Sequence, residues 1–250
     1  MKIILSPAKK MIADTDNIAP VELPAFIDKT AEILGWMKSK SKEELKAIWK
    51  CNDKIAEQNF NRLETMDLYN RLTPAVLAYE GIAFQYMAPA VFEIQQFEYL
   101  QNHLRILSAF YGILKPLDGV TPYRLEMQAK AEIEETTNLY DYWGDRLYHS
   151  VIDDSRIIIN LASKEYSKCI EKYLTPQDRY ISVTFCEAFG DKMVTKGTYA
   201  KMARGEMVRF MAENNIENPL DIKKFDRLGY SFRSDLSSET EYVFERKMEQ

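Results

Sequence analysis

Short apolar runs along the chain predict the strands of a buried sheet. Residues 2–6, KIILS, form an apolar run that stops at Pro7, and residues 156–163, RIIINLAS, form an aliphatic run flanked by charged residues. Residues 179–189, RYISVTFCEAF, alternate apolar and polar side chains, as a half-buried strand does. The first of these strands is expected to end at Ser6, immediately before the proline.

Three further stretches are interpreted as strands. Residues 104–114, LRILSAFYGIL, are too short an apolar run for periodicity to separate strand from helix, and we favour a strand. Residues 191–197, DKMVTKG, could pair with the preceding strand as a hairpin. In residues 228–246, LGYSFRSDLSSETEYVFER, two strands are expected around a polar turn.

Apolar residues spaced three and four apart predict helices between the strands. Such patterns run over residues 23–66, residues 139–152, residues 164–174 and residues 198–215. Ser41 and Glu44 form a capping box that opens one of the early helices, and Thr198 is expected to cap the last. Gly144 weakens the helical pattern in which it lies.

Strands and helices alternate without an internal repeat, a low-complexity linker or an abrupt change in composition. The chain has 250 residues, of which 46% are hydrophobic, so it can bury a sizeable core. We therefore expect a mixed α/β fold in which a mixed β-sheet is surrounded by helices. The simplest arrangement is one domain that spans residues 1–250.

The composition limits the classes of function. A formal net charge of −5 argues against a protein coated in basic surface, so any contact with nucleic acid must come from a local patch. No apolar run reaches the roughly 18 residues of a membrane span, and the N-terminal run is too short for a signal segment, so we expect a cytoplasmic protein with no membrane partner. Cys51, Cys169 and Cys186 show no CxxC spacing, so we expect reduced thiols, with Cys169 and Cys186 buried. His103 and His149 are far apart, so we expect no metal site and no cofactor.

The stretch YGILKPLDGVTPYRLEM, residues 111–127, is dense in glycine, proline and charged residues. Residues 119–122, GVTP, have the outline of a helix-hairpin-helix element, in which a glycine hairpin brings backbone N–H groups to a phosphate and proline starts the next helix. Thr121 stands where the element usually has its second glycine, and Asp118 puts a negative charge beside the expected phosphate. The alternative is a rigid turn between packed elements, with Asp118 and Thr121 as capping residues.

Polar side chains recur at the predicted ends of strands and in the loops next to them. They are Ser6, Lys9, Asp118, Arg124, Asn160, Ser163, Lys201 and Arg204. The carboxyl ends of strands are where α/β proteins bind ligands, because the loops there converge over a rigid sheet. A basic segment that includes Lys192, Lys196, Lys201, Arg204 and Arg209 would also suit phosphate, and the alternative is a solvated helix face.

Residues 6–9, SPAK, match the Ser-x-x-Lys pattern of penicillin-binding enzymes, in which the lysine helps to activate a serine nucleophile. The Ser-Asp-Asn element of those enzymes is missing, and residues 196–198, KGT, differ in order from their Lys-Thr-Gly element. We therefore expect Ser6 and Lys9 to hold an anion in a turn after the first strand.

A set of unusual stretches occurs in order along the chain. They are ILSPAK (residues 4–9), LRILSAFYGILKPLD with PYRLEM (residues 104–127), YWGD (residues 142–145), INLASKEYSK (residues 159–168), AKMARGEMVRF (residues 200–210), and GYSF with VFER near the end. In these stretches the sequence resembles the YaaA family of peroxide-stress proteins.

The resemblance implies a cytosolic protein that protects cells during hydrogen peroxide stress. Such a protein would help to lower free intracellular iron and so limit iron-dependent oxidative damage to DNA. The resemblance also implies a positively charged cleft and a helix-hairpin-helix-like element that binds duplex or branched DNA without reading its sequence.

Two functions follow from these residues. In the first, which we favour, the cleft holds DNA phosphates. The candidates for DNA or anion binding are Lys9, Lys10, Gly119, Thr121, Arg124, Asn160, Ser163, Lys196, Lys201, Arg204 and Arg209. In the second, an enzyme acts on a small anionic substrate such as a nucleotide, with Ser6, Asp118 and Glu126 as catalytic candidates and either carboxylate as the acid or base. The alternative for these carboxylates is a structural role, in ion pairs with the arginines.

Overall fold

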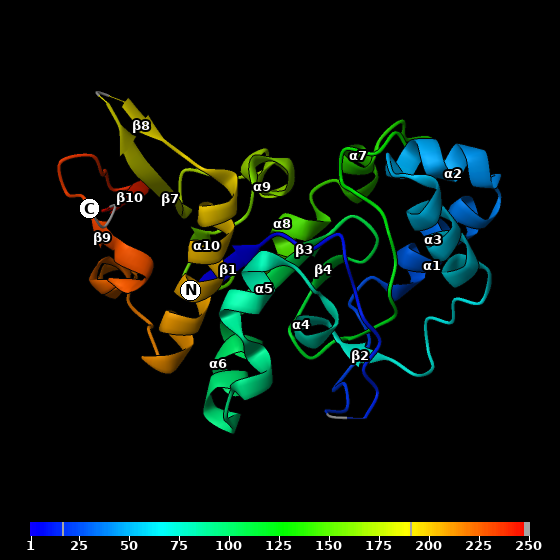
Figure 1. Cartoon of the computed structure of the whole chain (residues 1–250), viewed down its shortest axis with the longest axis horizontal. Helices are drawn as coiled ribbons and strands as arrows, with labels where there is room; N and C mark the ends of the chain where they lie inside the picture. Colours follow the sequence, from blue (N-terminus) through cyan, green and yellow to red (C-terminus); the bar gives the residue numbers. More distant parts are fainter. Residues whose placement is uncertain (17, 191, 248–250) are drawn as a thin grey trace.

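A mixed β-sheet forms the centre of the computed structural model, which describes residues 1–16, 18–190 and 192–247 (Figure 1). Within these residues the sheet has eight strands in the order β4-β3-β1-β6-β7-β10-β9, and β8 pairs with β7 outside that path. The strands are β1 (Lys2–Leu5), β3 (Leu104–Ser108), β4 (Gly112–Leu114), β6 (Ile157–Asn160), β7 (Arg179–Phe189), β8 (Lys192–Val194), β9 (Tyr230–Phe232) and β10 (Glu241–Arg246). A separate pair joins β2 (Thr73–Pro74) to β5 (Gly119–Val120).

Strand β1 lies in the parallel core of the sheet. It pairs in parallel with β3 on one side and with β6 on the other, and the parallel pairing continues from β6 to β7 and from β7 to β10. Strands β4, β8 and β9 run antiparallel to their neighbours, so the sheet is mixed, as predicted. Ile3, Ile4 and Leu5 are all buried, as expected for a strand covered on both faces.

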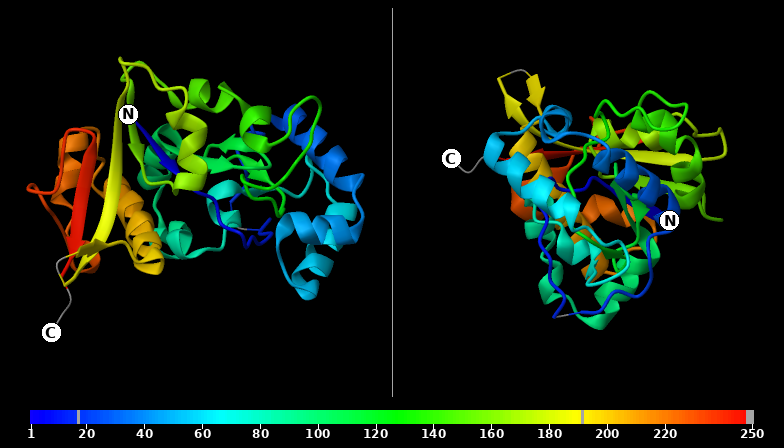
Figure 2. Two further views of the ribbon diagram at one scale, coloured as in Figure 1. Left: turned by 90° about the horizontal axis from the view of Figure 1, so that it is seen from above. Right: turned by 90° about the vertical axis from the view of Figure 1, so that its right-hand side faces the viewer.

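Helices pack around the sheet and confirm the predicted mixed α/β class. They are α1 (Ile27–Lys38), α2 (Lys42–Trp49), α3 (Asp53–Glu64), α4 (Ala75–Ala78), α5 (Ile82–Met87), α6 (Ile94–His103), α7 (Leu139–Trp143), α8 (Arg146–Val151), α9 (Lys164–Glu171) and α10 (Gly197–Glu213), with short 3-10 turns η1 (Pro89–Val91), η2 (Pro219–Lys224) and η3 (Arg227–Gly229). In Figure 1, α8 and α9 lie above β1 and β3, and α5 and α6 lie below them. Figure 2 shows α1, α2 and α3 gathered at one end of the molecule and β9 and β10 at the other.

Helix α10 packs against α5 at a close approach that only glycine allows. A Cβ atom built on Gly205 would lie 1.9 Å from the carbonyl oxygen of Ala83, where real Cβ atoms are essentially never found. The obstacle is backbone, so it cannot rotate out of the way. Gly205 therefore sets how near α10 comes to the start of α5, and with it the position of Lys201 and Arg204.

Several predicted elements are confirmed. The Ser41 hydroxyl accepts the N–H of Glu44 at 3.2 Å, and the Glu44 carboxylate accepts the N–H of Ser41 at 2.7 Å, which is the capping box. Strands β9 and β10 occupy the predicted tail and pair antiparallel. Strand β8 pairs with β7 as a hairpin, although residue 191 of the predicted segment lies outside the described residues.

Three local predictions differ from the structure. Residues 104–114 form two antiparallel strands, β3 and β4, because the chain turns back between them. The helix predicted over residues 139–152 divides into α7 and α8 at Gly144, whose φ of 55° lies in the left-handed region. Helix α10 begins at Gly197 with Lys196 at its N-cap, so Thr198 is already inside the helix and does not cap it.

The helix-hairpin-helix predicted at residues 119–122 is wrong. Gly119 belongs to β5, and residues 121–126 have no regular secondary structure, so no helix begins at Pro122. The N–H of Gly119 donates to the carbonyl of Glu22 at 2.8 Å, and the N–H of Thr121 donates to the Tyr111 hydroxyl at 2.9 Å. These donors are used within the protein, and Gly119 and Val120 form strand β5 where the alternative interpretation expected a turn.

Candidate functional site

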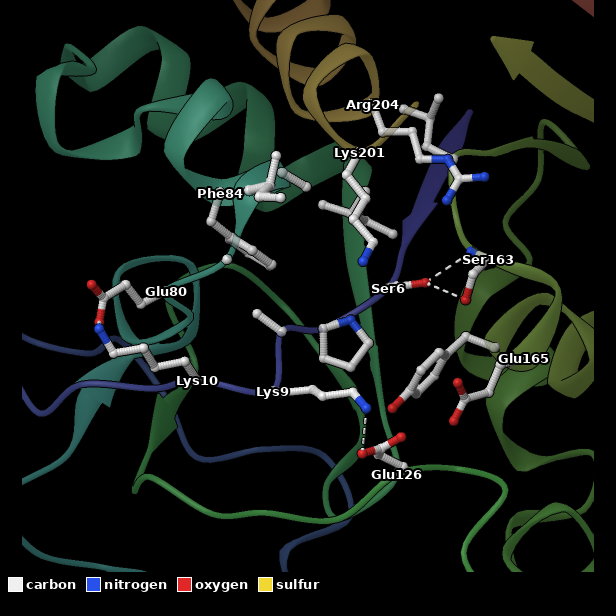
Figure 3. A pocket seen from close by; sticks show the side chains of 18 of the residues that line it. Ser6, Lys9, Lys10, Glu80, Phe84, Glu126, Ser163, Glu165, Lys201 and Arg204 are labelled. Carbon is white, nitrogen blue, oxygen red and sulfur yellow. Dashed lines mark hydrogen bonds and ion pairs between the residues drawn. The ribbon is translucent and has the colours of Figure 1, made fainter. Parts of the chain in front are cut away.

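A cavity of about 390 Å³ lies beyond the carboxyl ends of β1 and β6, and we call it the Ser6 pocket (Figure 3). Its walls come from the loop after β1, the start of α5, residues 123–126, the β6–α9 connection and helix α10. From β1 the chain passes to β3 on one side and later to β6 on the other. The pocket therefore lies at a topological switch point, where open α/β sheets commonly bind ligands.

Two serines join the strand ends at the centre of the pocket. The Ser6 hydroxyl accepts the backbone N–H of Ser163 at 2.8 Å and lies 3.1 Å from the Ser163 hydroxyl, to which it donates. Ser163 occupies the N-cap position of α9. The contact fixes the loop after β1 against the start of α9, and it places two hydroxyl groups on the pocket wall.

Lysines at the mouth of the pocket are paired with carboxylates. The Lys9 Nζ lies 2.8 Å from the Glu126 carboxylate, and the Lys10 Nζ lies 2.8 Å from that of Glu80. Both lysines are solvent-exposed, at 64% and 71% of their side-chain surface. Ion pairs so exposed contribute little, about 0–1 kcal/mol. These pairs can therefore open at small cost when a ligand arrives.

Helix α10 contributes two cations that are not paired. Among the described residues, neither Lys201 nor Arg204 has an ion pair or a hydrogen bond through its side chain. The Nε of Arg204 is buried without a partner, and burial lowers the pKa of this guanidinium. Lys201 is exposed. Figure 3 shows both side chains extending from α10 into the pocket.

A buried chain of hydroxyl groups lies behind one wall. The Tyr123 hydroxyl is 2.9 Å from that of Tyr79 and 2.7 Å from that of Ser108, the last residue of β3. Burial raises the pKa of Tyr123 to about 12 and also raises the pKa of Tyr166 on the neighbouring wall. Both tyrosines are therefore neutral at physiological pH; both line the pocket, and the Tyr123 hydroxyl is used in the buried chain.

The structure brings together part of the predicted site and leaves part outside. The predicted residues that line the pocket are Ser6, Lys9, Lys10, Arg124, Glu126, Ser163, Lys201 and Arg204. Those that do not line it are Asp118, Gly119, Thr121, Asn160, Lys196 and Arg209. Ser6, Lys9 and Lys10 follow β1, and Ser163 follows β6. These residues meet in the pocket because the two parallel strands end side by side at one edge of the sheet.

The residues outside the pocket have local structural contacts. Lys196 lies 2.7 Å from the Glu187 carboxylate, and the Arg209 Nε donates to Glu213 at 2.7 Å. The Asn160 side chain accepts the N–H of Ala162 at 2.8 Å at the end of β6. Asp118 lines a separate cavity of about 110 Å³, together with Glu22, Arg105 and Lys115.

Sequence reasoning missed several lining residues. They are Glu80, Phe84, Tyr123, Glu165 and Tyr166. Glu165 and Tyr166 lie in the first turn of α9, directly after Ser163, and their position at the start of the predicted helix was a usable signal. Glu80 and Phe84 lie just before and within α5, and they reach the pocket because α5 packs against α10. No local sequence pattern predicts that contact.

Other chemistry of the chain is more ordinary. Cys169 and Cys186 are buried as predicted, and burial raises the pKa of the Cys169 thiol to about 12. Across residues 1–16, 18–190 and 192–247, no three His, Cys, Asp or Glu side chains come together in a way that could hold a metal ion. In the same residues no helix is long and apolar enough to cross a membrane.

Comparison with known proteins gives matches along nearly the whole chain. The family described as peroxide stress protein YaaA matches residues 1–236. A UPF0246 protein of Agathobacter rectalis is 84% identical, over 99% of this chain and 100% of its own length. UPF0246 proteins of Lachnoclostridium phytofermentans and Ligilactobacillus salivarius are 54% and 51% identical, each over 98% of this chain and over 96% and 99% of their own lengths. The chain belongs to the family of the peroxide stress protein YaaA.

Proposed function

We propose that the Ser6 pocket binds a small anionic ligand that carries a phosphate group, such as a nucleotide, and that the protein serves the peroxide stress response through this ligand. The observation that carries the proposal is Arg204, a guanidinium with a buried Nε that has no partner among the described residues. The guanidinium extends into the pocket without an ion pair or hydrogen bond among these residues, and a phosphate oxygen would contact its terminal nitrogens through charge-assisted hydrogen bonds. Lys201, on the same helix, would contact the same group.

The composition of the pocket supports an anion with an apolar part. Its cationic side chains are Lys9, Lys10, Arg124, Lys201 and Arg204, and its carboxylates are those of Glu80, Glu126 and Glu165, so positive charge is in excess. Leu5, Phe84, Leu125 and Leu161 supply apolar walls that a bare phosphate would not need. A nucleoside attached to the phosphate would fill that space.

Binding is better supported than catalysis. The hydroxyl of Ser6 is held by Ser163, with no general base at hydrogen-bond distance among the described residues. If the ligand is also transformed, Glu126 is the group we propose as acid or base, because it lines the pocket and Asp118 does not.

Replacing Arg204 with methionine tests the proposal. Calorimetric titration with AMP and with inorganic phosphate is expected to show binding to the wild type, and a roughly tenfold or greater loss of AMP affinity in Arg204→Met, because a charge-assisted hydrogen bond is removed. The matched control is Arg209→Met, on the same helix but paired with Glu213 outside the pocket. Equal affinity in the two variants, or no binding by the wild type, would contradict the proposal.

A DNA-binding role is the second candidate, and the exposed lysines at the pocket mouth favour it. Lys9, Lys10 and Lys201 could contact a phosphate backbone without reading its sequence. Binding of labelled duplex and junction DNA should then weaken steeply with salt, and a Lys201→Ala/Arg204→Ala double variant should lose most of it. A shallow salt dependence, or an unchanged double variant, would exclude this role.

The limitation of iron-dependent damage is also part of the proposal. Cells that lack the protein should survive hydrogen peroxide poorly and hold more free iron. Arg209→Met is expected to restore both properties and Arg204→Met to restore neither. Full rescue by Arg204→Met would show that protection against peroxide does not depend on ligand binding in the Ser6 pocket.

A further inference from the structure

We propose that the ligand of the Ser6 pocket carries two separate anionic groups, and that Glu126 occupies the position of the second group while the pocket is empty. The first group would lie at Arg204 and Lys201, and the second at Lys9 and Arg124. This inference rests on the proposed phosphate binding and specifies its substrate class.

A second arginine of the pocket is also incompletely satisfied. The Arg124 side chain is only 11% exposed, and its Nε is buried without a hydrogen-bond partner among the described residues. Its nearest carboxylate oxygen, on Glu126, lies 3.7 Å from Nη2, which is too long for a hydrogen bond. Arg124 and Arg204 therefore bring two incompletely satisfied guanidinium groups to the lining of one cavity, and an anion at each would supply acceptors.

The two cationic groups are separated in space. Figure 3 shows Arg204 and the Lys9–Glu126 pair on opposite sides of the Ser6–Ser163 contact. Lys201 extends from α10 on the Arg204 side. One phosphate would therefore contact one group, and a ligand with two phosphates at different positions would contact both.

The Glu126 carboxylate resembles a ligand already in place. It lies 2.8 Å from the Lys9 Nζ, as a phosphate oxygen would, and it is shared with Arg124. Its side chain keeps 22% of its surface exposed, so it can turn towards solvent when a stronger anion arrives. Glu126 then acts as an internal competitor for the second anionic group, and a ligand that brings only the first group leaves it in place.

The class of ligand that fits is a nucleoside with two separately attached phosphates. We use adenosine 3′,5′-bisphosphate as the probe and AMP as its one-phosphate counterpart. Because the second phosphate makes further charge-assisted hydrogen bonds, the wild type should bind the bisphosphate about tenfold more tightly than AMP. Lys9→Met should bring the two affinities close together.

The decisive variant is Glu126→Gln, measured by calorimetric titration with both probes. Its bisphosphate affinity should rise about fivefold, since the ligand no longer breaks an ion pair, while its AMP affinity should change less than about twofold. The matched control is Glu22→Gln, which removes the same charge from a Lys115 pair outside the pocket and should alter neither. If AMP binds and the bisphosphate binds no more tightly, or if Glu126→Gln shifts both equally, the inference fails and phosphate binding stands. If neither probe nor inorganic phosphate binds, both proposals fail.

Discussion

Replacing Gly205 with alanine is expected to lower the free energy of unfolding by about 3 kcal/mol, the upper range for overpacking a core contact. In an unconstrained helix the same change would stabilise by up to about 1 kcal/mol. Here the added Cβ would lie 1.9 Å from the Ala83 carbonyl oxygen and 2.7 Å from its carbon. Helices α10 and α5 must therefore move apart.

Denaturant unfolding of Gly205→Ala and Gly35→Ala makes the comparison direct. Gly35 is inside α1, with no atom within 4 Å of its potential Cβ, so its substitution should leave stability equal or slightly raised. Because Lys201 and Arg204 lie on the helix that moves, Gly205→Ala should also weaken AMP binding. Equal stability in the two variants would show that the α5–α10 contact tolerates a side chain.

Because of Asp118, the free energy of unfolding is expected to fall as the pH rises through the neutral range. Its side chain is only 3% exposed; Oδ2 accepts the N–H of Lys115 at 2.8 Å, and Oδ1 has no partner among the described residues. Burial raises the pKa of this carboxyl to about 7. Glu22 acts in the same direction, while Lys115 and Arg105 oppose it.

The sign follows from the unfolded reference, in which an aspartic acid has a pKa of about 3.9. The folded state holds the proton more tightly, so its stabilising contribution is complete below about pH 4, declines as the pH rises and is lost above about pH 7. Three pKa units correspond to roughly 4 kcal/mol over that window. Asp118→Asn should lack this decline.

The measurement is the free energy of unfolding of the wild type and Asp118→Asn at several values between pH 4 and pH 8. Their difference should move in favour of the variant as the pH rises, because other titrating groups are common to both. Two parallel curves would mean that Asp118 ionises in the fold without cost. The size of the pH-independent part of the difference does not bear on the prediction, because the new amide can lose or gain a hydrogen bond at every pH.

Much of the sheet was predictable, since its strands carry their own signals. Residues 2–6 and 156–163 are apolar runs bounded by proline or charge, and both became neighbouring parallel strands. Once two parallel strands are assigned, their carboxyl ends meet, which is why Ser6, Lys9 and Ser163 were identified together. Local information sufficed for this part of the site.

The errors arose where distant segments decide the outcome. The residues around Gly119 have turn chemistry that suits a hairpin between helices, but pairing with β2 and with Glu22 makes a strand there instead. Lys196 looks available in the sequence, yet Glu187, on the adjoining strand β7, neutralises it. A single sequence does not contain the spatial pairing that separates Arg204 from Arg209 on one helix.

The place of β1 between β3 and β6 has a consequence for biosynthesis. Ile3 pairs with Leu104 on one side and with Ile159 on the other, so β1 is completed on its second edge about 150 residues after it is made. At about 5–20 residues per second, the ribosome needs roughly 8 to 30 s to cover that interval. Until β3 is made, about 100 residues after β1, the apolar KIIL segment has no strand to pair with, and its second edge stays open until β6 is made, so we expect nascent-chain chaperones to bind it.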